Sequence, residues 1–493
     1  MSIALIMVIV ILLVLLLIGS PVVMAIGTAA MSYFIFKPDM LSNLMMYAHR
    51  LFTGMDSFIY ICIPLFMLSG ELMGRTGLMD RVVDFCRIFV GRLRGGIAYV
   101  TILASMMFGC ISGSGLACIA ALGPIEISMM KSEGYKEDFA AALTATAAIQ
   151  GPVIPPSIPA VMFAGLTSVS VGSMFVGLVV PGVMLGIIQM MIVAYMARKY
   201  NFPKSDVHYT KKEAVQITLK SLGALFMVLL VLGGILSGVF TATEASAIAV
   251  VYVLLLDVLF THRLKLKDLW ECLKITTTGA CSIFLIIGFS SIVSWILAME
   301  NVPIMISNWV YAANISPYLL LFIFNIFTLF NGMWISDSAQ LVLFAPIFTP
   351  IFTSMGVSAV HVGVIMVVNV MIGMLTPPFG MALYTTASIS NCNLKQIVKA
   401  SLPFTFGCIV ILFLVTYIPA LGLTLPKLLG YLEKLRQERK NCRIPDLLSR
   451  GCGSFIRGAC LTERNCISAL PRAGNLSLTT ARMTGNIILV FRL

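Results

Sequence analysis

The sequence predicts an all-α polytopic membrane protein built from two repeats of opposite orientation. Of the 493 residues, 59% are hydrophobic and 11% are charged, whereas about a quarter of the residues of an average soluble protein are charged. A soluble fold of this length could not bury so much apolar surface. The apolar runs have helical length and lack the roughly ten-residue alternation of outer-membrane barrel strands. This composition also excludes disordered, disulfide-rich secreted and nucleic-acid-binding proteins.

Apolar segments of helical length follow one another along most of the chain. Amphipathic or charged stretches separate some of them, and the order of the elements repeats at an offset near 220 residues. The sequence therefore predicts a duplicated membrane domain. The apolar segments are 3–18, 22–36, 58–74, 97–124, 138–165, 172–197, 221–237, 241–260, 276–298, 317–355, 361–385 and 399–421, and the stretches between them are 42–55, 78–94, 262–275 and 302–313.

The repeat is clearest in the residues that interrupt helices. Pro124 and Pro346 are 222 residues apart, and so are Pro155 and Pro377. Two halves interrupted at corresponding places are typical of secondary transporters. We predict a first repeat (1–220) with a hairpin at about 97–124 and a broken helix at 138–165, a second repeat (221–426) with a hairpin at about 332–355 and a broken helix at 361–385, and a basic, Cys-containing tail (427–493).

The distribution of Lys and Arg indicates how the repeats are oriented. The Arg-rich stretch 75–94 and the Lys-rich loop 198–220 should both be cytoplasmic. Segment 97–124 must then enter and leave the membrane on the same side, as a re-entrant hairpin. Each repeat has an odd number of crossings as a result, so the second repeat is expected to be inverted relative to the first.

Each predicted hairpin comes shortly before a predicted helix break, and the residue types suit ion binding. Gly and Ser in Ser112–Gly115 leave backbone carbonyls free, and such groups must line a cavity because lipid cannot satisfy them. The three prolines within Gly151–Ser157 cannot continue a helix. Carbonyls that end one half-helix attract a cation, and N–H groups that open the next attract an anion. The alternatives are a small-residue helix contact and a plain hinge.

Few other residues indicate chemistry. Asp337 is the acid expected at membrane depth in the second hairpin, where it would ligate a cation or bind a proton, unless the tip protrudes into water. We interpret Thr241–Glu244 as a capping box and His361 as a helix-start residue. The chain has four His and lacks a zinc motif, a nucleophile–base pair and a P-loop. We therefore expect no metal centre, no enzyme activity and no coupling to ATP.

Several motifs in order give the chain a specific resemblance: Gly109–Ser114 (GCISGS), Lys131–Tyr135 (KSEGY), Gly151–Ser157 (GPVIPPS), Gly238–Ala245 (GVFTATEA) and Leu375–Gly380 (LTPPFG). From residue 1 to about 425 the chain resembles the large, DctM-like membrane subunit of TRAP transporters, the tripartite ATP-independent periplasmic permeases. The resemblance implies an ion-transporter-superfamily fold in the bacterial inner membrane and sodium-driven import of a small organic acid by an elevator motion. It also implies two partners, a small four-helix membrane subunit and a periplasmic substrate-binding protein.

The resemblance also implies candidate site residues. One sodium site would use Ser112, Gly113 and Ser114 facing Gly151, Val153 and Pro156, and the other would use the second tip facing Gly373, Leu375, Thr376 and Pro378. We expect the substrate near Ser114, Ser157, Asp337 and Thr376. The second tip departs from the family, which has an acid four residues after the tip glycine. Ser336 stands at that place here and Asp337 follows it, so either residue is the candidate ligand.

Other functions remain open at this stage. A stand-alone sodium- or proton-coupled carboxylate carrier or antiporter would need no binding protein, and a passive channel would not accumulate its substrate. C4-dicarboxylates, sialic acid and sugar acids are all possible substrates. Residues 441–493 match nothing in the family, so we suspect an aberrant extension and assign it no function. Four cysteines in the tail could form disulfides: Cys442, Cys452, Cys460 and Cys466.

Overall fold

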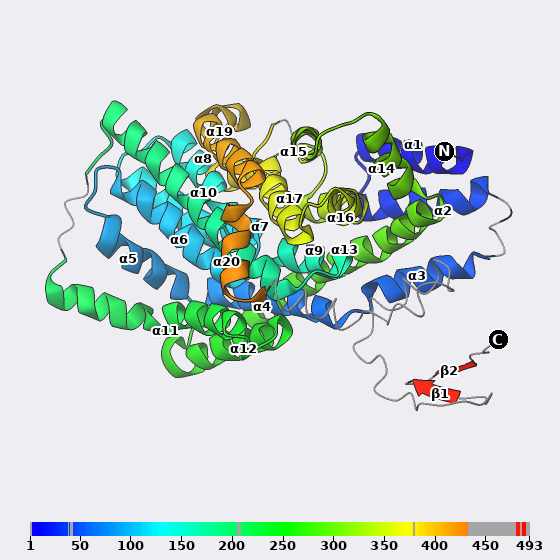
Figure 1. The fold of residues 1–493 in the computed structure, drawn as a ribbon. Helices are drawn as coiled ribbons and strands as arrows, with labels where there is room; N and C mark the ends of the chain where they lie inside the picture. The colour runs from blue at the N-terminus through cyan, green and yellow to red at the C-terminus, as the bar shows by residue number, and fades with distance from the viewer. Residues whose placement is uncertain are drawn as a thin grey trace. The chain divides into compact units, whose positions relative to one another are not determined.

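In the computed structural model, the chain forms two units, residues 1–431 and 432–493. The structure describes residues 2–37, 39, 43–204, 209–377, 380–431, 480–483 and 486–489. The described part of the first unit is helical apart from turns and short loops, which confirms the all-helical membrane architecture. Its helices follow the order α1 to α20 along the chain (Figure 1).

The first half of this unit begins with an apolar pair of helices and ends with a long one. Its elements are α1 (Ile3–Leu17), α2 (Val22–Phe36), α3 (Met45–Met55), the 3-10 helix η2 (Phe58–Ile61), α4 (Cys62–Arg75), α5 (Leu78–Val90), α6 (Gly96–Ser112), α7 (Gly115–Ser132), α8 (Glu137–Ala148), α9 (Ile158–Thr167) and α10 (Val171–Lys199).

The second half repeats this order, and a short helix, α20, follows it. The elements are α11 (Lys211–Leu236), α12 (Ala242–Leu256), the π-helical turn η3 (Asp257–Thr261), α13 (Leu266–Met299), α14 (Val302–Ala312), α15 (Pro317–Asn331), α16 (Asp337–Ser354), α17 (Ala359–Gly373), α18 (Met381–Ser390), α19 (Leu394–Tyr417) and α20 (Ala420–Leu428).

The helix bounds differ from the expected ones at two places. The second hairpin consists of α15 and α16 joined by a turn at 332–336, so it begins at Pro317 rather than near residue 332. Segments 262–275 and 276–298 form one continuous helix, α13, because Leu266–Met299 contains no proline. In the first half, α3 ends at Met55, and the extended backbone of Ser57 separates it from the next helix.

Six helices among the described residues are long and apolar enough to cross a membrane, and shorter apolar helices accompany them. Exposed Leu, Val and Phe side chains occur along α11 and α12, where lipid would cover them. The capping box predicted at Thr241–Glu244 is confirmed, since it opens α12. His361 does lie in the first turn of α17. The six long spans are Phe58–Arg75, Val171–Lys199, Lys211–Leu236, Ala242–Thr261, Leu266–Met299 and Leu394–Tyr417.

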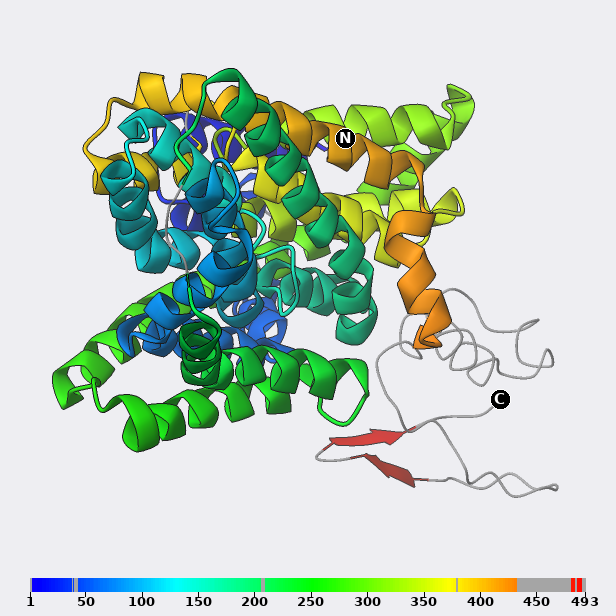
Figure 2. The same cartoon turned by 90° about the vertical axis from the view of Figure 1, so that its left-hand side faces the viewer.

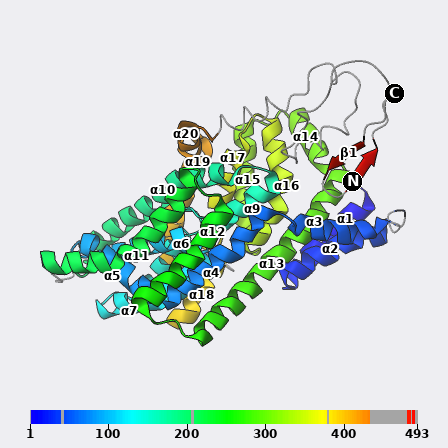
Figure 3. The same ribbon diagram turned by 90° about the horizontal axis from the view of Figure 1, so that it is seen from below.

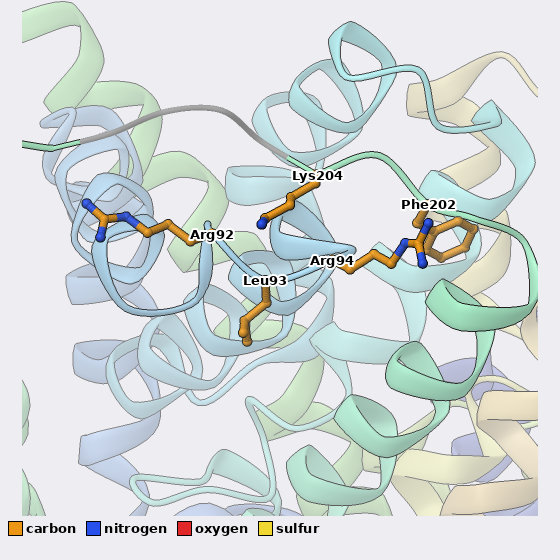
Figure 4. Close-up of a pocket in the computed structure, with 5 residues that line it drawn as sticks. All are labelled: Arg92, Leu93, Arg94, Phe202 and Lys204. Atoms are coloured by element: carbon orange, nitrogen blue, oxygen red, sulfur yellow. The ribbon is translucent and has the colours of Figure 1, made fainter.

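The two basic segments predicted to share a side of the membrane lie together. The Gly95 N–H donates to the Pro203 carbonyl at 3.2 Å, and Arg94 pairs with Lys204 through a backbone bridge. A cavity of about 500 Å³ between these loops is lined by Arg92, Arg94, Lys204, Leu93 and Phe202 (Figure 4). Such a gathering of cations suits the cytoplasmic face.

The two halves pack through their broken helices. Helix α9, which follows the first break, packs on α16 and α17 of the second half, and α18, which follows the second break, packs on α7 and α8. A second group of contacts joins α13 to α2, α3 and α4, and α12 to α4 (Figure 3). Helices α11 and α12 also contact one another (Figure 2). The hairpins and breaks of both halves thus meet in one cluster of helices.

In the second unit, the described residues form two short antiparallel strands, β1 (Thr480–Met483) and β2 (Asn486–Leu489), with Thr480 opposite Leu489. The sequence predicted no element there. The four tail cysteines proposed for disulfides lie outside the described residues.

Candidate ion and substrate site

The first hairpin turns sharply at its tip. Helix α6 ends at Ser112, Gly113 takes the left-handed conformation with φ 61°, and Ser114 opens α7 by accepting a hydrogen bond from the Ala117 N–H at 3.4 Å. The Ser112 hydroxyl donates to the Ser114 carbonyl at 3.3 Å. Gly113 suits this turn because a left-handed backbone strains other residues. Ser112 is buried and Ser114 is partly exposed.

The first helix break is completely buried. Helix α8 ends at Ala148 and α9 begins at Ile158, and every residue from 149 to 157 is shielded from solvent. The Ser157 hydroxyl accepts from the Ala160 N–H at 3.2 Å and also donates to the Pro152 carbonyl. Ser157 therefore caps the second half-helix, as the helix-start pattern requires.

The tip and the break touch through their backbones. The Ile158 N–H donates to the Gly113 carbonyl at 3.4 Å, and an added Cβ on Gly113 would lie 2.8 Å from the Pro156 carbonyl oxygen. Gly109 lies against Gly151 so closely that a Cβ on Gly109 would overlap the Gly151 Cα. The structure thus brings the predicted tip of the first site next to Gly151 and Pro156, with buried Val153 in the same break.

The second half repeats this contact with a different tip. A Cβ on Gly332 would lie 2.7 Å from the Gly373 Cα, so these glycines correspond to Gly109 and Gly151. Helix α17 ends at Gly373, and the next turn includes Leu375, whose N–H donates to the Ile372 carbonyl at 3.0 Å. The repeat predicted from spacing therefore appears again in the contact between tip and break.

The remaining predicted residues lie around this second contact. Asp337 is the first residue of α16 and is partly exposed, and Ser338 Oγ donates to its Oδ1 at 3.5 Å. Ser336 precedes it as the N-cap, without a side-chain capping bond. The Thr376 hydroxyl donates to the Ile372 carbonyl at 3.2 Å. Pro378 lies outside the described residues.

Sequence reasoning missed two buried amides beside the glycine contacts. Gln150 directly precedes Gly151, and Gln340 on α16 lies near Gly332, with its Oε1 3.3 Å from the position of an added Cβ. Both Oε1 atoms are buried without a hydrogen-bond partner within the described part of the chain. The sequence feature that could have identified them is a polar residue within an apolar segment, because such a residue is costly in a membrane and is usually functional.

This arrangement can hold a hard monovalent cation in each half. Backbone carbonyls, Ser and Thr hydroxyls and an amide oxygen are all oxygen ligands that can replace the water around such an ion. At the start of α9 the Ile158 N–H donates to the Gly113 carbonyl and the Ala160 N–H donates to the Ser157 hydroxyl, so this helix start is joined to the tip and capped. The two glycine contacts therefore offer a place for a cation in each half.

A comparison with known proteins identifies the family that this chain matches. The family model described as tripartite ATP-independent periplasmic transporter, DctM component, matches residues 9–421. The C4-dicarboxylate TRAP transporter large permease protein DctM of Pseudomonas aeruginosa is 37% identical over 82% of this chain and 93% of its own length. The sialic acid TRAP transporter large permease protein SiaM of Vibrio cholerae is 32% identical over 85% of this chain and 97% of its own.

Solved structures share the fold at low sequence identity. The YdaH transporter of Alcanivorax borkumensis has a TM-score of 0.58 and 15% identity, over 78% of this chain and 90% of that one. MtrF of Neisseria gonorrhoeae has a TM-score of 0.56 and 14% identity, over 84% of this chain and 94% of that one. At such identities the likeness concerns the architecture alone.

Proposed function

Because the chain belongs to the DctM component family of tripartite ATP-independent periplasmic transporters, we propose that it is a permease that couples sodium entry to import of a small organic acid. The supporting observation is the glycine contact between tip and break, present once in each half. Each contact gathers free oxygen atoms in a buried place, which suits sodium better than a proton relay.

The substrate and partners of this proposal come from the family. Its relatives are named for C4-dicarboxylate and sialic acid, so we propose a small carboxylate of this kind as substrate. A periplasmic binding protein would deliver it, and a small membrane subunit would complete the permease in the bacterial inner membrane. Ser114, Ser157, Asp337 and Thr376 remain the proposed substrate-facing residues.

We further propose an elevator motion. The hairpins and broken helices contact one another across the two halves, and α2, α3, α4, α12 and α13 form a second group of contacts that meets the first through α4 and α13. The first group would carry substrate and sodium together, while the second would stay fixed in the bilayer. Rigid-body movement of one group of helices against another is common among transporters with inverted repeats.

Uptake in proteoliposomes tests the sodium coupling. The permease, its small subunit and its binding protein would be reconstituted, and uptake of labelled C4-dicarboxylate and sialic acid measured with sodium or with potassium outside. We expect uptake to collapse in potassium. Full uptake without sodium under a proton gradient would overturn the proposal.

Two serine variants test whether the sodium dependence of uptake originates at the first hairpin tip. Ser112→Ala removes a hydroxyl at the first tip, and we expect it to raise the sodium concentration needed for half-maximal uptake by roughly tenfold, the equivalent of about 1.4 kcal/mol. Ser132→Ala is the matched control, because its hydroxyl also bonds a nearby carbonyl, that of Met129 at 2.8 Å, but on the exposed end of α7. Equal sodium dependence of uptake in both variants would show that the Ser112 hydroxyl does not contribute to the sodium site.

A further inference from the structure

Glu126 is a buried carboxyl that the transport site does not use. It lies on α7, the second arm of the first hairpin, and its side chain is fully shielded from solvent. Its Oε1 accepts a hydrogen bond from the Ser105 hydroxyl of α6 at 3.2 Å. Its Oε2 has no hydrogen-bond partner within the described part of the chain. The Thr144 hydroxyl of α8 faces the same carboxyl and is buried.

No basic side chain neutralises this carboxyl among the described residues. Helices α6, α8 and α18, which pack on α7, carry no Lys or Arg. The titratable groups that face Glu126 are two thiols, Cys86 of α5 and Cys118 of α7. The basic groups on α4, α5 and α7 are engaged elsewhere, in Arg75–Glu271 (2.6 Å), Arg87–Glu133 (2.8 Å), Lys131–Glu137 (2.6 Å) and Arg81 to the Lys220 carbonyl (3.4 Å).

An ionised carboxylate in these surroundings would be costly. Removing an unpaired charge from water costs several kcal/mol even after the protein relaxes. A proton on Oε2 removes the charge and supplies a donor for Thr144 Oγ1, while Oε1 continues to accept from Ser105. A hard cation would be a poorer occupant, because it prefers about six oxygen ligands and this place offers one carboxyl and two hydroxyls.

We propose that Glu126 is a proton-binding site of the first hairpin, in which Ser105 and Thr144 hold the carboxyl in its acid form. The site is separate from the hairpin tip and does not depend on the proposed sodium coupling. Three helices contribute to it, so the proton joins both hairpin arms to the first half of the broken helix. Loss of the proton would place an unpaired charge among these helices and loosen them.

A cavity lies beside α7 near Glu126 in sequence, although Glu126 itself does not line it. A cavity of about 300 Å³ borders α7 at Ile125 and Met129, on either side of Glu126 in sequence. Asp80 and Asp84 of α5 line the same cavity. This cavity lies on the α5 side of the hairpin, away from the tip at Ser112–Ser114.

Infrared spectroscopy of the full-length chain in lipid nanodiscs tests the proposal directly. We expect a carbonyl band of a protonated carboxylic acid at neutral pH, which disappears in Glu126→Gln. Glu133→Gln is the control, because Glu133 forms an ion pair with Arg87 at the end of the same helix, and it should leave the band unchanged. Absence of the band in the native chain, or a spectrum of Glu126→Gln that matches the native one, would overturn the proposal.

Thr144→Val covers the case in which Glu126→Gln fails to fold. This variant keeps the acid and removes its proposed acceptor, so the carbonyl band should move to the frequency of a less hydrogen-bonded acid. An unmoved band would exclude Thr144 from the site and contradict the proposal.

The pH dependence of thermal unfolding gives a second readout. The native chain should lose stability relative to Glu126→Gln as the pH rises through the range in which the glutamate ionises in the unfolded chain but keeps its proton in the buried site, and the two should converge at low pH. Replacing potassium by sodium should not change this difference. Stabilisation of the native chain by sodium, absent from Glu126→Gln, would show a cation at Glu126 instead of a proton and overturn the proposal.

Discussion

The contact between Gly109 and Gly151 leaves no space for a side chain on Gly109 and little on Gly151. A Cβ on Gly109 would overlap the Gly151 Cα, and backbone cannot move aside as a flexible side chain can. We expect Gly109→Ala to cost about 1–3 kcal/mol of packing between tip and break, and transport to fall by roughly tenfold or more. Uptake at matched membrane abundance measures this effect.

Gly233→Ala provides the matched control. Gly233 lies on exposed α11 with no atom within 4 Å of an added Cβ, and alanine favours a helix there. Normal uptake in both variants would show that the glycine contact is dispensable. Gly332→Ala should reproduce the loss if the second contact serves the same purpose.

The ion pair between Lys37 and Glu300 predicts a pH effect on stability. The Lys37 ammonium lies 2.9 Å from Glu300 Oε1, and the Tyr33 hydroxyl donates to the same oxygen at 2.7 Å. The hydrogen bonds from Lys37 and Tyr33 lower the pKa of Glu300. The stabilisation is therefore present above the ordinary carboxyl pKa and is lost as the pH falls through the lowered one.

Glu300→Gln should lower the unfolding temperature at neutral pH, and the difference should begin to shrink below about pH 4 and vanish once the pH is below the lowered pKa of Glu300. The expected loss is about 0.5–1 kcal/mol, because Lys37 is partly exposed and solvent weakens the pair. Glu137→Gln, in an exposed pair with Lys131, should change little. A difference that persists unchanged in acid would contradict the ionic origin.

Residue types predicted where helices are interrupted, but not which groups the buried residues contact. A helix break at Pro155 and Pro156 can be predicted in any fold, because proline lacks the backbone N–H donor. A turn at Gly113 can be predicted in the same way, because glycine readily adopts a left-handed backbone. Nothing in the spacing indicates that Gly109 would meet Gly151 or that Glu126 would face Ser105. Those contacts depend on how α6, α7 and α8 pack, which a single apolar pattern leaves undetermined.

The hairpins are the elements on which the proposed orientation depends. We expect a Cys at Ser114 to be labelled by a thiol reagent from the cytoplasm in the inward state, and a Cys at Ser338 from the periplasm in the outward state. Both serines are partly exposed at helix starts near the tips. The native cysteines, several of which are buried, would first be replaced.

Ser69→Cys is the control for this labelling, because Ser69 is fully buried on α4 and should stay unlabelled from both sides. If the cysteines introduced at Ser114 and Ser338 were both labelled from the same side alone, the second repeat would not be inverted relative to the first. The hairpin bounds show why such tests need the structure. Segment 317–355 is apolar throughout, so hydropathy did not indicate where α15 ends and α16 begins.

At the scale of the whole chain, the boundary of the permease lies at Tyr431. Residues 1–431 form one unit, which extends slightly beyond the predicted end near 426. The Tyr431 hydroxyl donates to the Ile235 carbonyl at 3.1 Å, and its ring packs on Gly172 at the start of α10. The composition of the tail marked a change near this place, but not the aromatic contact that closes the unit.

We therefore expect truncation after Tyr431 to leave uptake within a few-fold of the full chain. Among the described residues, all the hairpins, breaks and long apolar helices lie before that residue, so the truncated chain keeps each group proposed for transport. Truncation after Gly430 should insert normally but lose thermal stability, because it removes the bond and ring contact that join the end of α11 to the start of α10. Tyr431→Phe in the full chain separates the hydrogen bond of Tyr431 from its ring contact, because it keeps the ring and removes the hydroxyl. We expect this variant to lower the free energy of unfolding by about 1 kcal/mol or less. Uptake and unfolding temperature at matched abundance measure all three. Loss of transport on truncation after Tyr431 would assign a function to the tail.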